Sequence, residues 1–261
     1  MIFGNQIITN LKCAINIFNP TRCIVCGDEL RFFEKAFCTK CLSELPLTYF
    51  WNYPDNYGKE LFPINLHIKS VISLLFYKGE VKEAIHKFKY NHNLNIGKVL
   101  GEYLGIQLSQ MAIIQSFIED GFIIIPIPIH WLKKRKRGYN QSEIIAHYIK
   151  RGMRNSYPKV QIEIENHLIK RKNFTSTQTK LHKLERFRNI QNAFSLNIRR
   201  FQKMLKGLRK VNIFIVDDVL TTGATITACA QLISDQYNIY YAKEPSPPQL
   251  NIYVATLAIG I

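Results

Sequence analysis

From about residue 71 onward, hydrophobic runs alternate with segments of helical periodicity. An amphipathic region covers residues 80–115, and a second helical pattern begins after Gly138. Runs without polar alternation, such as residues 122–125 and 211–216, are typical of strands buried on both faces in a parallel sheet covered by helices. The pattern therefore predicts an α/β fold. The expected strands fall within 71–77, 122–129, 160–169, 211–216 and 251–259.

We expect three parts along the chain. Residues 1–48 contain a cysteine cluster and are predicted to form a small module. The segment TYFWNYPDNYGKELFP at 48–63 is broken by two prolines and a glycine, which predicts a linker over 49–70. Residues 71–261 would form the main domain, with a loop at the proline-rich segment 244–249.

The N-terminal segment MIFGNQIITNLKCAINIF has polar residues at intervals too short for a signal sequence or a membrane span. We therefore expect a cytoplasmic protein without membrane insertion. The 35 Lys and Arg residues against 19 Asp and Glu give a formal net charge of +16. Such a charge favours polyanionic partners such as phosphates or nucleic acid, although a basic surface that only maintains solubility explains it equally well.

Four cysteines have the spacing of a metal site: Cys23 and Cys26 form one CxxC pair, and Cys38 and Cys41 form a second, with eleven residues between the two pairs. Two such turns can direct four thiolates at one tetrahedral zinc ion, with no position left open, which indicates a structural site. The alternative is two disulfides, but these rarely persist in a reducing compartment.

Two further cysteines have no such spacing. Cys13 has no partner nearby, and Cys229 shares one face of an expected helix with hydrophobic residues. We interpret both as core residues.

The segment 211–233 combines an expected strand, two acids, a short loop and an amphipathic helix. Small residues in the loop allow close approach of an anion, and the N–H groups at the helix start would point toward it. Asp217 and Asp218, at the end of the strand, could accept hydrogen bonds from sugar hydroxyls or hold a hydrated cation. The alternative is a plain strand-to-helix turn with exposed acids. The loop consists of Thr221, Thr222, Gly223, Ala224 and Thr225.

Basic residues are concentrated in two segments. One is the continuous run Lys133, Lys134, Arg135, Lys136 and Arg137; the other includes Arg171 and Arg186. A run of this kind is most often a solvated loop. The alternative is that the two segments flank one pocket, where they would neutralise pyrophosphate or contact a nucleic-acid backbone.

The strand, acid pair, Thr-Thr-Gly loop and helix resemble the phosphoribosyl pyrophosphate motif of type I phosphoribosyltransferases. Together with the cysteines, the wider chain resembles the ComF family, which includes GntX-like proteins and joins a four-cysteine module to such a domain. Three more segments carry this resemblance: FKYNHNLNIGKVLGEYL at 88–104, IIIPIPIHWLKKRKRGYNQSEII at 123–145 and LIKRKNFTSTQTKLHKLERFRNIQNAF at 168–194.

The resemblance implies a type I phosphoribosyltransferase-like parallel sheet flanked by helices, with an N-terminal zinc-ribbon-like module. It implies that Asp217 and Asp218 contact ribose hydroxyls and that residues 221–225 surround the 5′-phosphate. Pro126, Ile127 and Pro128 match the pyrophosphate loop, and residues 171–189 match a flexible loop that closes over the ligand. The connection 237–250 is longer than family members usually have.

Two functions follow as hypotheses. The first is a magnesium-dependent phosphoribosyltransferase, resembling amidophosphoribosyltransferases, in which a nucleophile displaces pyrophosphate from C1 of phosphoribosyl pyrophosphate. A purine base is a less expected acceptor, because Thr221 stands where purine-specific enzymes have an acid. The second is a module for natural transformation that binds the same ligand, single-stranded DNA and competence proteins, since a fold does not fix a function.

Overall fold

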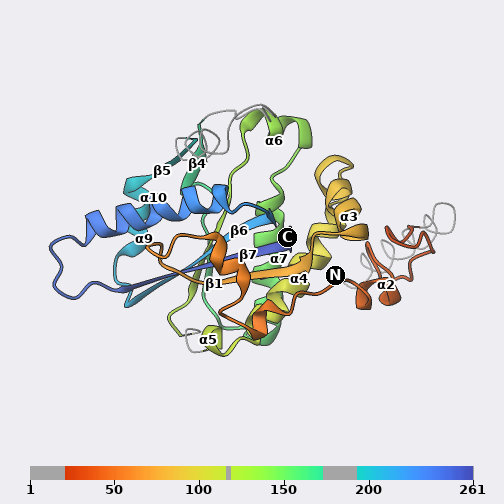
Figure 1. Ribbon diagram of the computed structural model, residues 1–261, viewed down its shortest axis with the longest axis horizontal. Coiled ribbons are helices and arrows are strands. Elements are labelled where there is room, and N and C mark those ends of the chain that lie inside the picture. Colours follow the sequence, from red (N-terminus) through yellow and green to blue (C-terminus); the bar gives the residue numbers. More distant parts are fainter. Residues whose placement is uncertain (1–20, 116–118, 173–192, 261) are drawn as a thin grey trace, which may run out of the picture.

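The computed structural model describes residues 21–115, 119–172 and 193–260 (Figure 1). A five-stranded sheet forms its centre, and its strands are β1 (Ile68–Phe76), β2 (Phe122–Pro126), β3 (Ile162–Ile164), β6 (Lys210–Leu220) and β7 (Gln249–Ile259). The order is β1-β7-β6-β2-β3, and every neighbouring pair is parallel. The predicted α/β fold with a parallel sheet flanked by helices is confirmed.

Helices cover both faces of the sheet. On one face lie α3 (Gly79–Tyr90), α4 (Leu94–Ser109) and α7 (Gln141–Ser156), whose buried residues join one hydrophobic cluster with Phe214 and Val216 of β6. On the other face, α9 (Ile198–Leu205) and α10 (Ala224–Tyr240) pack with Ile213 and Ile215. Alternate residues of β6 thus belong to separate cores, as expected for a strand buried on both faces.

The remaining elements are short. They are α2 (Thr39–Ser43), two 3₁₀ turns, η1 (Phe50–Asn52) and η2 (Tyr57–Leu61), α5 (Ala112–Gln115), α6 (Trp131–Arg137), and an antiparallel pair, β4 (Ile169–Arg171) and β5 (Phe194–Leu196). The amphipathic region at 80–115 therefore contains three helices. Within the described residues, no helix is long and apolar enough to cross a membrane.

The contact between α4 and α7 depends on glycines. A Cβ atom at Gly105 would lie 2.3 Å from the carbonyl oxygen of Ile149, and one at Gly152 would lie 2.2 Å from that of Glu102. These backbones are so close that no larger residue fits without moving a helix. The close packing fixes α7 against the sheet, and the first residues of α7 lie at the candidate site described below.

The cysteine-containing segment packs against the main sheet domain. Ala36 and Phe37 are buried in the cluster formed by α3, α4 and α7, and Lys87 of α3 donates to the carbonyl oxygen of Ile24 at 3.1 Å. Within residues 49–70, Phe50 and Phe62 are buried in the opposite cluster. The expected linker thus contributes side chains to the core, and the division at residues 48 and 70 stays a prediction.

Candidate functional site

The acidic pair lies near the carboxyl end of β6. The sequence predicted that the strand stops at these acids, but β6 continues through them to Leu220 because Asp217 and Val219 remain paired with β7. Asp218 forms an ion pair with Lys89, in which Nζ lies 2.9 Å from Oδ1. Asp217 Oδ1 accepts hydrogen bonds from Ser142 Oγ at 3.1 Å and from the N–H of Asp218 at 2.9 Å.

The environment of Asp217 disfavours its ionised form. Burial, followed by the adjacent charge of Asp218, raises the pKa of Asp217 to about 7. The N–H of Asp218, the ammonium group of Lys89 and the hydroxyl of Ser142 oppose this rise. The pair therefore carries a charge that is sensitive to its immediate partners near neutral pH.

Sequence reasoning did not find Lys89 and Ser142. Lys89 is one of several lysines on an amphipathic helix, and Ser142 is a common residue at a helix start. Nothing in their local pattern indicates a contact with residues more than seventy positions away. The only available signal was that both fall within segments that resemble the ComF family, 88–104 and 123–145.

The loop after the acidic pair has the conformation expected for an anion site. Gly223 precedes α10 with φ 72°, and a Cβ there would lie 3.1 Å from Phe62 Cε1, so this position favours glycine. No side chain caps the start of α10. A hollow of about 40 Å³ lies between Asp217 and residues 219–226. Unpaired N–H groups at a helix start attract anions.

The loop after β2 lies beside the same end of β6. The N–H of Ile127 donates to the carbonyl oxygen of Val216 at 2.9 Å, so this loop continues the pairing between the two strands. Asn140, at the start of α7, donates from Nδ2 to the carbonyl oxygen of Ile127 at 3.0 Å. The structure therefore brings residues 126–128 next to the acidic pair, and their role as a pyrophosphate loop stays a prediction.

The first basic segment is a helix rather than the solvated loop that such runs most often form. Residues 131–137 form α6, which is capped by His130 and ends at Gly138 with φ 77°. Residues 133 and 137 are half-buried, whereas 134–136 are exposed. The four-residue spacing places Lys133 and Arg137 on one face of the helix.

That face belongs to a cationic cluster at the acidic pair. Burial lowers the pKa of Lys133, and the neighbouring charges of Arg171, Arg137 and Lys89 lower it further. Burial also lowers the pKa of Arg171 on β4, while the carboxylate of Asp217 opposes that shift. Cations from α3, α6 and β4 thus lie near two acids of β6. Arg186 and most of the segment 171–189 lie outside the described residues.

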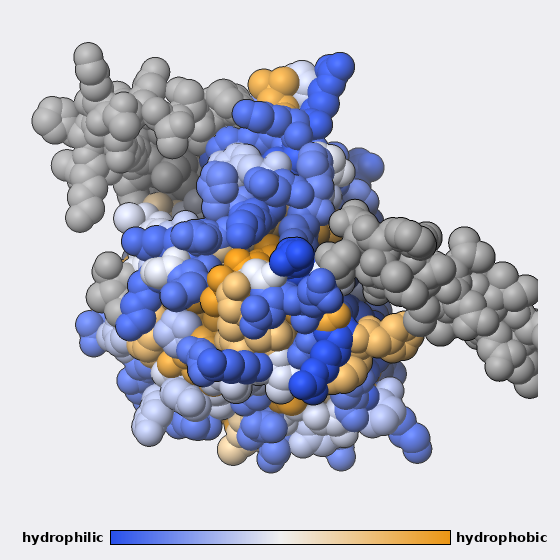
Figure 2. All heavy atoms as spheres, turned by 90° about the vertical axis from the view of Figure 1, so that its right-hand side faces the viewer, coloured by the Kyte–Doolittle hydropathy of each residue, from blue (hydrophilic) through white to orange (hydrophobic). Residues whose placement is uncertain are grey.

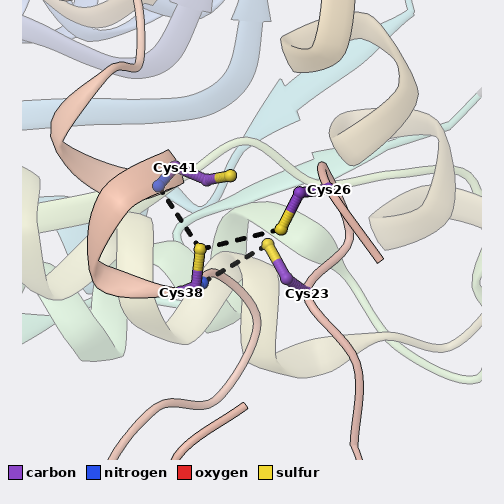
Figure 3. A group of neighbouring side chains, drawn as sticks. All are labelled: Cys23, Cys26, Cys38 and Cys41. Carbon is purple, nitrogen blue, oxygen red and sulfur yellow. Dashed lines mark hydrogen bonds between the residues drawn. The ribbon is translucent and has the colours of Figure 1, made fainter. Parts of the chain in front are cut away.

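The side chains of the four cysteines come together in one group (Figure 3). Their sulfur atoms all lie within 4.8 Å of one another, and those of Cys26 and Cys38 are 3.8 Å apart. Zn–S bonds of about 2.3 Å place the sulfur atoms of a tetrahedral site about 3.8 Å apart. The N–H of Cys38 donates to Cys23 Sγ at 3.3 Å, and that of Cys41 to Cys38 Sγ at 3.4 Å.

The four thiols differ in how readily they ionise without a metal. Burial raises the pKa of Cys23, but backbone N–H groups, first that of Cys38, donate to its sulfur and bring the pKa to about 6. Burial raises the pKa of Cys41 far above its usual range, and the neighbouring thiols add to this rise. A metal ion would bind all four as thiolates, so binding would release protons. The four residues can hold one structural zinc ion.

Comparison with known proteins gives related chains over most of the length, although no family model matches. Competence protein F of Haemophilus influenzae is 25% identical over 84% of this chain and 93% of its own length. The DNA utilization protein YhgH of Escherichia coli K12 is 24% identical over 81% of this chain and 83% of its own. Competence protein ComFC of Bacillus subtilis is 23% identical over 63% of this chain and 58% of its own length.

These relatives, at 23–25% identity, support a ComF family assignment for this chain. The family resemblance inferred from the sequence is therefore confirmed, including the union of a four-cysteine module with an α/β domain. Cys229, which the sequence assigned to the core, is fully buried on α10. Cys13 lies outside the described residues. His130 caps the start of α6.

We predict that this protein contains about one zinc ion per chain, because four thiolates at this spacing satisfy one tetrahedral ion. Replacing Cys38 with serine should remove most of the metal and lower the melting temperature, since metal binding contributes to folding. Elemental analysis of the purified protein and of the variant checks both expectations.

The matched control is Cys229→Ala, which creates a core cavity and destabilises the protein without touching the cluster. It should retain its full zinc content. A folded native protein without zinc, or a Cys38→Ser variant with unchanged zinc and stability, would overturn the assignment.

Proposed function

We propose that this ComF protein binds phosphoribosyl pyrophosphate at the carboxyl end of the sheet and acts in DNA uptake during natural transformation. The observation that carries the ligand proposal is the acidic pair Asp217–Asp218, which lies between an uncapped helix start and a cationic cluster. Such a site offers acceptors for sugar hydroxyls next to donors for two phosphate groups.

Each part of the ligand has a counterpart. The 5′-phosphate would bind the N–H groups at the start of α10 and the hydroxyls of Thr221, Thr222 and Thr225. The ribose hydroxyls would donate to Asp217 and Asp218. The pyrophosphate would lie along residues 126–128, with Mg²⁺ bound to its oxygens and with cations of α6 and β4 nearby.

An active phosphoribosyltransferase is the second candidate. In that reaction the bond between C1 and pyrophosphate breaks, a nucleophile forms a new bond to C1, and pyrophosphate leaves with its electron pair. Arg171 interacts with Asp217, and Lys133 lies near Arg171, Arg137 and Lys89, so these cations could stabilise the charge of the leaving group. Their position supports this reaction, and the acceptor and any catalytic base are unassigned.

DNA contact is supported by the outer face of α6 and by the names of the relatives. Lys134, Arg135 and Lys136 are exposed, and Trp131 on the same helix is 61% exposed. An exposed aromatic ring beside cations can stack on a base while the cations contact phosphates. Figure 2 shows that the upper part of this side of the molecule, toward α6, is mainly hydrophilic. Of the three relatives described above, two are named for competence and one for DNA utilization.

We also place the protein in the cytoplasm. A reducing compartment keeps cysteine pairs available for metal instead of disulfides. Cys23, Cys26, Cys38 and Cys41 are free thiols that can share one ion. Competence proteins are proposed as further partners, by extension from the names of the relatives.

The ligand proposal predicts that phosphoribosyl pyrophosphate with Mg²⁺ raises the melting temperature, because a ligand that binds only the native state stabilises it. In the double variant Asp217→Asn and Asp218→Asn, the shift should disappear while the protein still folds. Thermal unfolding at several ligand concentrations provides the measurement.

The control is Asp235→Asn on the exposed side of α10, which removes one carboxylate outside the site. It should show the full shift. If the double variant were stabilised as strongly as the native protein, the acids would not bind the ribose. Release of pyrophosphate in the presence of an acceptor would favour the active transferase.

For DNA, we predict that single-stranded DNA binds with little sequence preference and with an affinity that falls steeply as salt increases. Each phosphate contact contributes about −0.7 to the log–log salt slope for single strands. The triple variant Lys134→Ala, Arg135→Ala and Lys136→Ala should flatten this slope by roughly two units if all three contact phosphates. Fluorescence anisotropy across a salt series measures the slope.

A second triple variant serves as the control. It replaces three exposed cations on and after α9, namely Arg199, Lys203 and Lys206, and should leave the slope nearly unchanged. The DNA proposal is wrong if the α6 variant loses phosphoribosyl pyrophosphate binding while its DNA binding stays the same. That result would assign the basic run to the phosphate ligand alone.

A further inference from the structure

Lys89 is a protein cation placed directly on the acidic pair. Its ammonium group lies 2.9 Å from Asp218 Oδ1, and both side chains are largely shielded, with 21% and 12% of their surfaces exposed. Burial disfavours the charged form of Lys89, but the charge of Asp218, its hydrogen bond and the charge of Asp217 raise the pKa of Lys89 above its usual value. The lysine is therefore held charged by these two acids.

The backbone of Lys89 is fixed by the two residues before it. Lys87 donates to the carbonyl oxygen of Ile24 in the cysteine module at 3.1 Å. The carbonyl oxygen of Phe88 accepts a hydrogen bond from the hydroxyl of Tyr139, which lies between α6 and α7. The ring of Phe88 is fully buried. Contacts on both sides of α3 thus hold Lys89 in one place, and an ammonium group held in this way can orient its partner.

A purely structural role explains the ion pair between Lys89 and Asp218 less well. A buried ion pair often contributes no more to stability than well-packed hydrophobic residues of similar size. The ion pair belongs to neither hydrophobic core, Asp217 beside it lines the hollow before α10, and Pro126 pairs with Val216 just before the two acids. Its location therefore points to the ligand.

We propose that Lys89 is a positioning residue, which balances the charge of the acidic pair and holds Asp218 toward the ribose hydroxyls, so that the pair needs no divalent cation of its own. This inference rests on the proposed function. Mg²⁺ would then be required for the pyrophosphate part of the ligand alone. The ribose and 5′-phosphate should bind without added Mg²⁺.

Several other groups interact with Lys89 or with the two acids and have to be considered in any pH experiment. They come from every element around it: Tyr77 after β1, Lys133 on α6, Ser142 on α7, Arg171 on β4 and Cys229 on α10. Among the described residues, Lys89 forms an ion pair with Asp218. Replacing Lys89 should therefore change the ionisation of the acids most directly.

Ribose 5-phosphate without added Mg²⁺ is the probe, because it contains the ribose and the 5′-phosphate but no pyrophosphate. Calorimetric titration should give binding to the native protein that strengthens as pH rises through about 7, the pKa of Asp217, since ionised acids accept the hydroxyl hydrogens. Lys89→Met should weaken binding about tenfold or more at neutral pH.

The pH profile separates positioning from simple support of the fold. In Lys89→Met the acidic pair has lost its cation and ionises only at higher pH. The acid limb of the profile, the pH range below which binding weakens, should therefore move up by about 1–3 pH units. Lys89→Arg keeps a cation and should keep the limb near its native position. A variant that only loosened the fold would lower affinity without moving the limb.

Lys82→Met is the matched control, because Lys82 is an exposed lysine of the same helix and the change in charge and side chain is identical. It should bind ribose 5-phosphate like the native protein. If Lys89→Met does not fold, Lys89→Gln, which retains a hydrogen-bond donor, replaces it with the same expected shift of the limb.

The outcomes distinguish this inference from the function on which it rests. Native protein that binds neither ribose 5-phosphate nor phosphoribosyl pyrophosphate would contradict both. Native binding with an unchanged limb in Lys89→Met, or in its glutamine replacement, overturns the role of Lys89 alone. Native binding of ribose 5-phosphate only when Mg²⁺ is added also overturns it, because the pair would then need a divalent cation.

Discussion

The parallel pairing of β6 with β2 and β7 determines where the groups of the candidate site lie. Because the pairing with β7 runs the length of β6, the two acids sit on a rigid strand instead of a loop. The same pairing extends into Ile127 after β2, so the loop after β2 and the loop before α10 meet at one edge of the sheet. Ligand sites in parallel sheets commonly lie at this carboxyl edge.

Helix packing places the partners of the acids. The glycine contacts between α4 and α7 hold Ser142 at Asp217, while α3 presents Lys89 to Asp218. Helix α3 also contacts the cysteine module through Lys87. The four-cysteine cluster and the candidate ligand site therefore both contact α3.

The sequence predicted those features that have local signatures. Hydrophobic runs without alternation gave the strands, and the CxxC spacing gave the cluster of thiols, because both depend on neighbouring residues. The pairing of Lys89 with Asp218 depends on the tertiary fold, which no local pattern specifies. The helical form of 131–137 was missed because a continuous basic run has no amphipathic period, although its His130 cap and Gly138 end are recognisable in retrospect.

A crystal structure with phosphoribosyl pyrophosphate and Mg²⁺ tests the central claim most directly. The account predicts the 5′-phosphate at the start of α10 and the ribose hydroxyls on Asp218, with Lys89 still in contact with that acid. A second cavity, of about 530 Å³, lies at the amino ends of β2 and β6 beside Arg200 and Lys203. Ligand bound in that cavity, with the acidic pair left uncontacted, would contradict the account.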